Sequence, residues 1–184
     1  METNYKRWSD PRSTWGSQHP ARAKFVGRVI DKLAPSIKTK TILDLGCGDQ
    51  ILRRNISNEL QYIPADIYKR SSDCITLDLN KNEYPDNSYG VISAIGVIEY
   101  LNDVNLFFSS LSTRCEALVC TYSPAEGNPG KHPNWHNYMT NESFLSIALR
   151  YFELRTLFRM HTTQSLFVFR PGSSGFQRQN HVGT

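Results

Sequence analysis

The apolar residues of this chain recur with two periods, one typical of helices and one typical of strands. A first group follows at steps of three and four residues until Pro35 interrupts it, and its members are Phe25, Val26, Val29, Ile30 and Leu33. This spacing predicts one face of a helix that begins near residue 21 and covers a sheet. The next segment, 41–45, is short, apolar and partly β-branched, which predicts the first strand.

Strand and helix patterns then alternate along the chain. A helix is expected from about Gln50 to Leu60, and another over 103–111. Further strands are predicted at four places, which are 61–65, 74–77, 89–95 and 117–122. Because helices separate strands in this pattern, we expect parallel pairing in an α/β sheet whose central strands are buried on both faces.

The C-terminal part begins with a long segment, 123–137, that is rich in Pro, Gly, Asn and His. A loop of this length inside a compact domain is usually functional or disordered. A helix is expected to start near Thr140. The segments 152–160 and 165–170 are rich in β-forming residues and are joined by a short linker, which predicts an antiparallel hairpin at one edge of the sheet.

The 184 residues suit one domain, which we expect to span residues 21–170. Residues 1–20 are polar but include the aromatic side chains of Tyr5, Trp8 and Trp15, and we expect an N-terminal arm or lid over the site. Packing of these aromatic rings on the outer helices is an equal alternative. Residues 171–184 are expected to form a disordered tail.

Composition and charge narrow the class of protein. The chain is 39% hydrophobic and 21% charged, as in an ordinary globular domain. Its formal net charge of +4 comes from scattered basic residues, so a nucleic-acid partner is disfavoured. The first 20 residues lack the apolar stretch of a secretory signal, and the longest apolar segment, 89–101, is too short to span a bilayer. We therefore expect a cytoplasmic location and no membrane partner.

The cysteines do not predict a metal site or a disulfide framework. Their spacing shows no metal-ligand pairs, and a reducing compartment disfavours disulfides. We expect Cys47, Cys74, Cys115 and Cys120 to be buried thiols.

The turn after the first strand carries the strongest chemical signal. It reads Asp44-Leu45-Gly46-Cys47-Gly48 and precedes the expected helix. Glycines let the backbone turn sharply and approach a ligand, and the N-terminus of a helix favours anionic groups. A nucleoside or an anionic group is therefore expected here, although the same Gly-x-Gly pattern also occurs in turns without ligands.

Two acidic strand ends extend this signal. Asp66 ends the second strand 18 residues after Gly48, where a carboxylate can accept hydrogen bonds from both ribose hydroxyls. Asp78 closes the next strand, where its carboxylate can accept a hydrogen bond from an adenine amino group. The Leu79 N–H can then donate to a ring nitrogen of the same base. The nicotinamide-dinucleotide fingerprint needs a third glycine where this chain has Ile51, so that alternative is weaker.

These segments resemble the class I S-adenosylmethionine-dependent methyltransferases over residues 41–170. The resemblance is carried by the segment 42–48, by Asp66, by the turn at Asp78, and by the segment 86–92 that leads into 96–101. It implies a Rossmann-like, seven-stranded, mostly parallel sheet in a three-layer sandwich, with the antiparallel C-terminal hairpin as its last part. It also implies S-adenosyl-L-methionine as cofactor and S-adenosyl-L-homocysteine as product.

The resemblance further implies which residues contact the cofactor. In chain order these are Asp44, Gly46, Cys47, Gly48, Gln50, Asp66, Ile67, Asp78, Leu79, Ala94, Ile95 and Gly96. The first group would surround the methionine part, and the last three would line the cofactor beside the transferred methyl group. Many family members have a glycine at the position of Gln50, so this side chain would either bond the methionine carboxylate or weaken binding.

Methyl transfer needs an acceptor atom held in line with the carbon–sulfur bond, and an oxygen acceptor also benefits from a general base. The candidate catalytic residues are His132 and His136 in the long loop and Glu99 and Tyr100 after the fourth strand. The two histidines have the spacing of a metal pair, but they flank a Pro-Asn-Trp loop segment, so no metal is expected. They could also be plain surface residues, and Tyr100 could pack in the core.

A small molecule is the expected acceptor. The fourth strand ends without the Asn-Pro-Pro-Tyr type of motif that amino-methylating DNA enzymes use, and no Pro-Cys nucleophile is present. A nucleic-acid methyltransferase is therefore the weaker alternative. The other alternative is a non-catalytic module that binds S-adenosylmethionine and regulates a partner.

Overall fold

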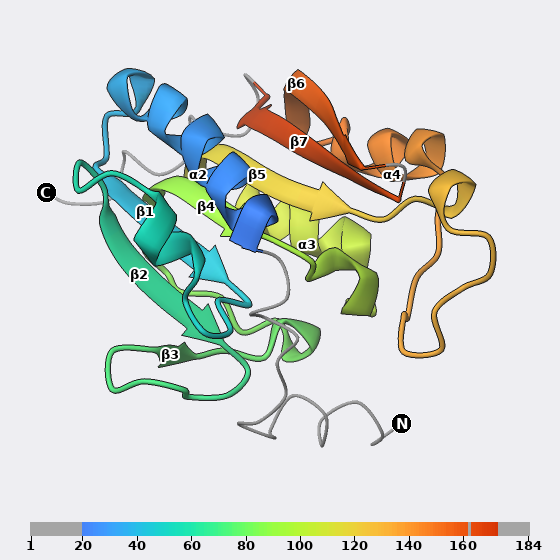
Figure 1. Ribbon diagram of the computed structural model, residues 1–184, viewed down its shortest axis with the longest axis horizontal. Helices are drawn as coiled ribbons and strands as arrows, with labels where there is room; N and C mark the ends of the chain where they lie inside the picture. The colour runs from blue at the N-terminus through green and yellow to red at the C-terminus, as the bar shows by residue number, and fades with distance from the viewer. Residues whose placement is uncertain (1–19, 162, 173–184) are drawn as a thin grey trace, which may run out of the picture.

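Seven strands form one sheet in the computed structural model of the protein, which describes residues 20–161 and 163–172 (Figure 1). The strands are β1 (Thr41–Leu45), β2 (Gln61–Asp66), β3 (Ile75–Thr76), β4 (Tyr89–Ala94), β5 (Cys115–Tyr122), β6 (Phe152–His161) and β7 (Gln164–Pro171). Their order is β3-β2-β1-β4-β5-β7-β6. The first five strands pair in parallel, whereas β7 is antiparallel to both β5 and β6. The predicted mostly parallel sheet with an antiparallel C-terminal hairpin is confirmed.

Helices cover both faces of this sheet, which makes three layers (Figure 1). The α-helices of the described part are α2 (Pro20–Leu33), α3 (Val104–Leu111) and α4 (Asn141–Ala148). Short 3₁₀ helices are η1 (Ala34–Ser36), η2 (Leu52–Asn55), η3 (Leu79–Lys81), η4 (Ile98–Tyr100) and η5 (Ala125–Gly127). Helix α2 and η2 pack in one apolar cluster, and α3 and α4 pack in the other.

Side-chain alternation along the strands assigns residues to these two clusters. In β1, Ile42 packs with α2, whereas Leu43 and Leu45 pack with α3 and α4. All six residues of β4 are buried, as expected for a central strand covered on both faces. The central strands therefore form a rigid platform whose ends are fixed in space.

The helix expected from Gln50 to Leu60 is wrong. Gln50 has φ +55, in the left-handed region, so the chain turns there instead of entering a helix. Only the single turn of η2 follows, and its Asn55 carbonyl lies against Gly27 of α2, where an added Cβ would be 2.0 Å from the oxygen. Close backbone contact between η2 and α2 therefore replaces an amphipathic helix.

The remaining predictions can be compared with the structure segment by segment. The helices predicted near residues 21, 103 and 140 are present as α2, α3 and α4. All four cysteines are buried free thiols, as predicted. Strand β3 is shorter than expected. Residues 1–19 of the predicted arm lie outside the described residues. Residues 173–184 of the predicted tail lie outside them as well. No helix in the described ranges has the length and apolarity to cross a membrane.

Candidate active site

A cleft of about 880 Å³ lies at the carboxyl-terminal edge of the sheet. Strand order reverses between β1 and β4, and ligands of open α/β sheets bind beside such a reversal. The cleft is lined by the turn after β1, the ends of β2 and β4, η3, η4, the first turn of α2, the loop after β5 and the β6–β7 hairpin. It therefore adjoins every strand end that the sequence singled out.

Twelve of the sixteen predicted site residues line this cleft. From the expected cofactor contacts they are Gly46, Gly48, Asp66, Ile67, Asp78, Leu79, Ile95 and Gly96, and from the catalytic candidates Glu99, Tyr100, His132 and His136. Asp44 and Cys47 instead line a small adjoining hollow of about 70 Å³ behind the glycine turn. Gln50 and the fully buried Ala94 line neither space. The fold thus gathers most of the predicted residues without showing what each one binds.

The glycine turn after β1 is tight and leaves little room for side chains. Gly46 has φ +70, and a Cβ there would lie 2.5 Å from Cγ2 of Val97. Gly48 also has a positive φ, and its N–H donates a hydrogen bond of 2.9 Å to Oδ2 of Asp66. The turn is therefore held against Val97 and against Asp66 at the end of β2. Its glycines present backbone without side chains to the cleft.

Backbone donors orient the carboxylate of Asp66 at the end of β2. Its Oδ2 accepts the Gly48 N–H, and its Oδ1 accepts the Tyr68 N–H at 3.3 Å. An ionised carboxylate offers about four lone-pair sites, so each oxygen keeps acceptor capacity after these contacts. Asp66 can therefore accept further hydrogen bonds from a ligand in the cleft.

Asp44 supports the turn from inside the protein. Its side chain is 3% exposed and accepts hydrogen bonds from the hydroxyls of Tyr62 (2.5 Å) and Ser93 (2.6 Å). Burial raises the pKa of Asp44 to about 6, although these two hydrogen bonds oppose the shift. These two hydrogen bonds join β1 to β2 and to β4 just before the glycine turn.

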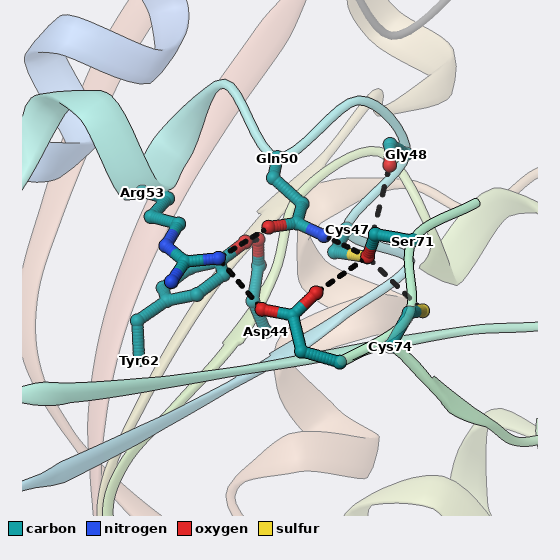
Figure 2. A network of polar contacts seen from close by, with 9 residues as sticks. Asp44, Cys47, Gly48, Gln50, Arg53, Tyr62, Ser71 and Cys74 are labelled. Atoms are coloured by element: carbon teal, nitrogen blue, oxygen red, sulfur yellow. Dashed lines mark hydrogen bonds and ion pairs between the residues drawn. The ribbon is translucent and has the colours of Figure 1, made fainter. Parts of the chain in front are cut away.

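The side chain of Gln50 belongs to a polar network beside the turn (Figure 2). Its amide nitrogen donates to Ser71 Oγ at 2.5 Å, and its oxygen accepts from Arg53 at 3.0 Å. Arg53 also forms an ion pair with Asp73 at 2.7 Å. The side chain is thus already satisfied by protein groups, and its predicted contact with the cofactor stays a prediction.

Two of the buried thiols meet under the same turn. The Sγ atoms of Cys47 and Cys74 lie 3.8 Å apart, and both side chains are buried (Figure 2). Burial and the neighbouring carboxylates of Asp44 and Asp66 raise the pKa of the Cys47 thiol far above its usual value. Cys47 is therefore protonated and packs as a small apolar residue.

Asp78 and Leu79 line the cleft at the start of η3, and both are predicted adenine contacts. Asp78 caps η3 because its Oδ1 accepts the Asn80 N–H at 3.0 Å. Leu79 is the first residue of η3, so its N–H has no acceptor within that helix. This arrangement presents a backbone donor next to a carboxylate, as the adenine hypothesis requires.

Glu99, in η4, is a buried carboxylate with one oxygen unused. The side chain is 2% exposed, its Oε1 accepts the Ser123 N–H at 2.9 Å, and its Oε2 has no hydrogen-bond partner among the described residues. Burial raises the pKa of Glu99, and the hydrogen bonds from Ser123 and the charge of Arg22 oppose this shift. A buried acceptor without a partner in a cleft wall is the arrangement expected where a ligand donates a hydrogen bond.

The loop after β5 is attached to η4 by its backbone. The His136 N–H donates to the Glu99 carbonyl at 2.8 Å, and the Asn137 side chain donates to the Ile98 carbonyl at 2.6 Å. The His136 ring contacts Asn102 through Nδ1 at 2.7 Å. His132 lies near Trp135, with ring centroids 5.8 Å apart. The described residues hold no cluster of three or more metal-ligating side chains.

Sequence reasoning missed several polar or aromatic cleft residues, among them Arg22, Asn80, Trp135, Arg159 and Gln164. The sequence analysis does not single out Arg22, and nothing in the sequence shows that the first turn of α2 reaches the glycine turn after β1. Gln164 begins β7, and its place in the cleft depends on how the hairpin folds against β5. These positions become visible only when the packing of the helix and the hairpin is known.

Comparisons with known proteins agree with this geometry. The family model described as a methyltransferase domain matches residues 18–166. The structure of the PH0226 protein from Pyrococcus horikoshii OT3 is similar, with 14% identity and a TM-score of 0.66 over 92% of this chain and 97% of that chain. A methyltransferase from Clostridium acetobutylicum ATCC 824, described as S-adenosylmethionine-dependent, has 11% identity and a TM-score of 0.63 over 94% of each chain. The [4+2]-cyclase SpnF also matches, with 14% identity and a TM-score of 0.65 over 88% of this chain and 84% of that chain. A comparison with curated proteins gives no match.

Proposed function

Since this chain belongs to the methyltransferase-domain family, we propose that it uses S-adenosylmethionine to methylate an oxygen or nitrogen atom of a small-molecule acceptor. The cofactor follows from the family, and the similar C. acetobutylicum protein is described as dependent on it. The proposal also includes a cytoplasmic location. The cyclase SpnF has the same fold, so the acceptor and the reaction must be argued from the site and not from the fold.

The observation that carries the proposal is the hydrogen bond between Gly48 and Asp66. The Gly48 N–H fixes the Asp66 carboxylate at 2.9 Å, and both residues line the cleft. A vicinal diol such as the ribose of a nucleoside can donate two hydrogen bonds to one carboxylate. The bare turn at Gly46 leaves space beside that diol for the rest of the cofactor.

The bound cofactor supplies an electrophilic methyl group on a sulfonium sulfur. The task of the protein is then to hold the acceptor atom about 3 to 3.5 Å from that methyl carbon and in line with its bond to sulfur. Gly96 has φ +68 in the turn after β4 and lines the cleft, and we place the transferred methyl group beside this turn. The loop residues His132, Trp135 and His136 also line the cleft, and we place a small acceptor beside them.

For an oxygen acceptor we assign the general base to Glu99. Among the four catalytic candidates, it is the one that combines burial with a side-chain oxygen that has no partner. A carboxylate whose pKa is raised by burial is better matched to proton transfer near neutral pH than an exposed one. His132, His136 and Tyr100 then contact the acceptor without taking its proton.

A panel of small molecules tests the proposal. The protein is incubated with S-adenosylmethionine and separate hydroxy acids, sugars, phenols and amines, and S-adenosylhomocysteine is quantified. We expect acceptor-dependent product from at least one class. Tight binding of S-adenosylhomocysteine without turnover on any compound would favour the non-catalytic module, and turnover only on oligonucleotides would favour the nucleic-acid alternative. Either outcome contradicts the small-molecule assignment.

A further inference from the structure

Charged side chains are distributed unevenly over the lining of the cleft. The lining residues between positions 45 and 80 include three carboxylates and one cation, Arg70, which is ion-paired with Asp49 at 3.5 Å. The lining residues from position 123 onward include no carboxylate. The two segments that supply most of them, 127–141 and 154–172, contain no Asp or Glu at all. The loop and the hairpin therefore bring no negative side chain to the cleft.

Arg159, in β6, gives this part of the lining a positive charge. Three arginines line the cleft, and two of them have protein partners, since Arg22 donates to Gln164 Oε1 at 3.4 Å and Arg70 pairs with Asp49. Arg159 is exposed and has no hydrogen bond or ion pair with any residue that the structure describes. All the N–H donors of its guanidinium group are therefore available to a ligand.

The register of the sheet places Arg159 close to the predicted position of methyl transfer. Arg159 pairs with Ser165 of β7, and Ser165 pairs with Tyr122 of β5. Adjacent strands lie about 4.8 Å apart, so the backbone of Arg159 is roughly 10 Å from that of Tyr122. The next residue, Ser123, donates its N–H to Glu99 Oε1 at 2.9 Å. A small molecule with one end at Glu99 can therefore reach the Arg159 side chain with its other end.

The loop after β5 is attached to the hairpin beside Arg159. The side-chain nitrogen of Asn128 donates to the Thr163 carbonyl at 2.8 Å, and both residues line the cleft. The Tyr138 hydroxyl donates to the Asn128 carbonyl at 2.5 Å, which holds this part of the loop in place. Loop and hairpin thus enclose one space, and Arg159 is the arginine that they contribute to it.

We propose that the acceptor is an acid, whose carboxylate or phosphate group binds Arg159 while its reacting hydroxyl lies at Glu99. This inference rests on the proposed function and adds the charge of the acceptor to it. A guanidinium group presents two parallel N–H donors that match two oxygens of a carboxylate or a phosphate. Because the loop and the hairpin contain no carboxylate, nothing in them competes for the guanidinium group or repels the anion. A neutral acceptor of the same shape would lack this ion pair, so the site distinguishes acceptors by charge.

Three matched pairs of acceptors test the proposal. They are para-hydroxybenzoate with para-hydroxybenzamide, lactate with lactamide, and glycerol phosphate with glycerol, and kcat/KM is measured from S-adenosylhomocysteine formation. In each pair that reacts we expect the acid to be the better substrate by about tenfold or more. Arg159→Met should lower kcat/KM for that acid about 10- to 100-fold and leave its neutral counterpart nearly unchanged. Comparison of the first two pairs with the third separates carboxylate from phosphate.

Two further variants complete the design. Arg159→Lys keeps the charge without the planar fork and should show an intermediate loss. Arg155→Met is the matched control, because Arg155 is an exposed residue of the same strand, pairs with Glu153 at 2.9 Å and lies outside the cleft lining. It should react like the wild type, and thermal melting checks that each variant is folded.

The outcomes separate this inference from the proposed function. A neutral compound that reacts as well as its acid, an unchanged kcat/KM for the acid in Arg159→Met, or equal losses for both members of a pair would overturn the acidic acceptor and leave the methyltransferase assignment intact. Tight binding of S-adenosylhomocysteine without turnover on any of the six compounds or on the wider panel would overturn both.

Discussion

The hydroxyl of Tyr62 donates a 2.5 Å hydrogen bond to Asp44, joining β2 to β1 directly beneath the glycine turn. Burial still raises the pKa of Asp44 to about 6, so the folded protein holds a proton there that the unfolded chain releases near pH 4. The raised pKa of Asp44 therefore measures the free-energy penalty of burying an ionised carboxylate beneath the cofactor site.

The first prediction concerns this cost. Between about pH 4 and pH 6 the folded state binds more protons than the unfolded state, so the free energy of unfolding falls as the pH rises, by roughly 3 kcal/mol from Asp44. Asp44→Asn lacks this contribution. Urea denaturation at several pH values should show the difference in stability, wild type minus Asp44→Asn, falling by that amount across the interval. Parallel curves would show that Asp44 has an ordinary pKa.

The second prediction concerns Asp66. Asp66→Ala removes two acceptor oxygens for the cofactor ribose and also releases the Gly48 N–H, so we expect the Kd of S-adenosylhomocysteine to rise at least about tenfold. Calorimetry measures this change, and circular dichroism checks the fold. Asp86→Ala, an exposed carboxylate outside the cleft lining, is the matched control and should bind normally. Unchanged affinity in Asp66→Ala would remove the ribose assignment.

The third prediction separates chemistry from binding at Glu99. The amide oxygen of Glu99→Gln can still accept the Ser123 N–H, but the variant cannot take a proton. With a hydroxyl acceptor we expect kcat to fall about 10²- to 10⁴-fold while the Kd of S-adenosylhomocysteine changes little. The wild-type kcat/KM should rise with pH as Glu99 ionises, and the variant should lack this rise.

Glu126→Gln is the control for that experiment, because Glu126 also accepts a backbone N–H, from Asn141 at 2.9 Å, but lies outside the cleft lining. Its turnover and its pH profile should match those of the wild type. If Glu99→Gln also keeps full turnover and the same pH profile, Glu99 is not the base.

The fourth prediction concerns the loop histidines. His132→Ala and His136→Ala should change kcat/KM for the acceptor several-fold more than they change cofactor affinity, because both line the cleft and neither is among the predicted cofactor contacts. Paired kinetics and calorimetry on each variant measure the two effects. Full activity in both variants would return the loop to a purely structural role.

The parts of the fold predicted from sequence are those in which local pattern and packing agree. The apolar run 41–45 became β1 with the expected ends, and Asp103 and Thr140 cap α3 and α4 through their side chains. The segment after Gln50 was mispredicted because one left-handed residue and the approach to Gly27 determine its path. Neither feature produces a hydrophobic period that a sequence can reveal.

The site shows the same division. Gly46, Gly48, Asp66 and Asp78 were found because each lies at or just after the end of a strand, and the ends of parallel strands meet at one edge. Arg22 and Gln164 were missed because they enter the cleft from elements whose positions depend on tertiary packing. The unused oxygen of Glu99 is likewise a property of three-dimensional burial.

The predicted cofactor contacts and the other lining residues of the cleft come largely from different stretches of the chain. Residues 46–80 together with Ile95 and Gly96 supply the predicted cofactor contacts in the cleft, whereas η4, the loop after β5 and the β6–β7 hairpin supply many of its other lining residues. Mutations in the loop and the hairpin can therefore change the surroundings of the acceptor without replacing a predicted cofactor contact. Related proteins with this arrangement can therefore differ in the molecule that they methylate while they keep the same methyl donor.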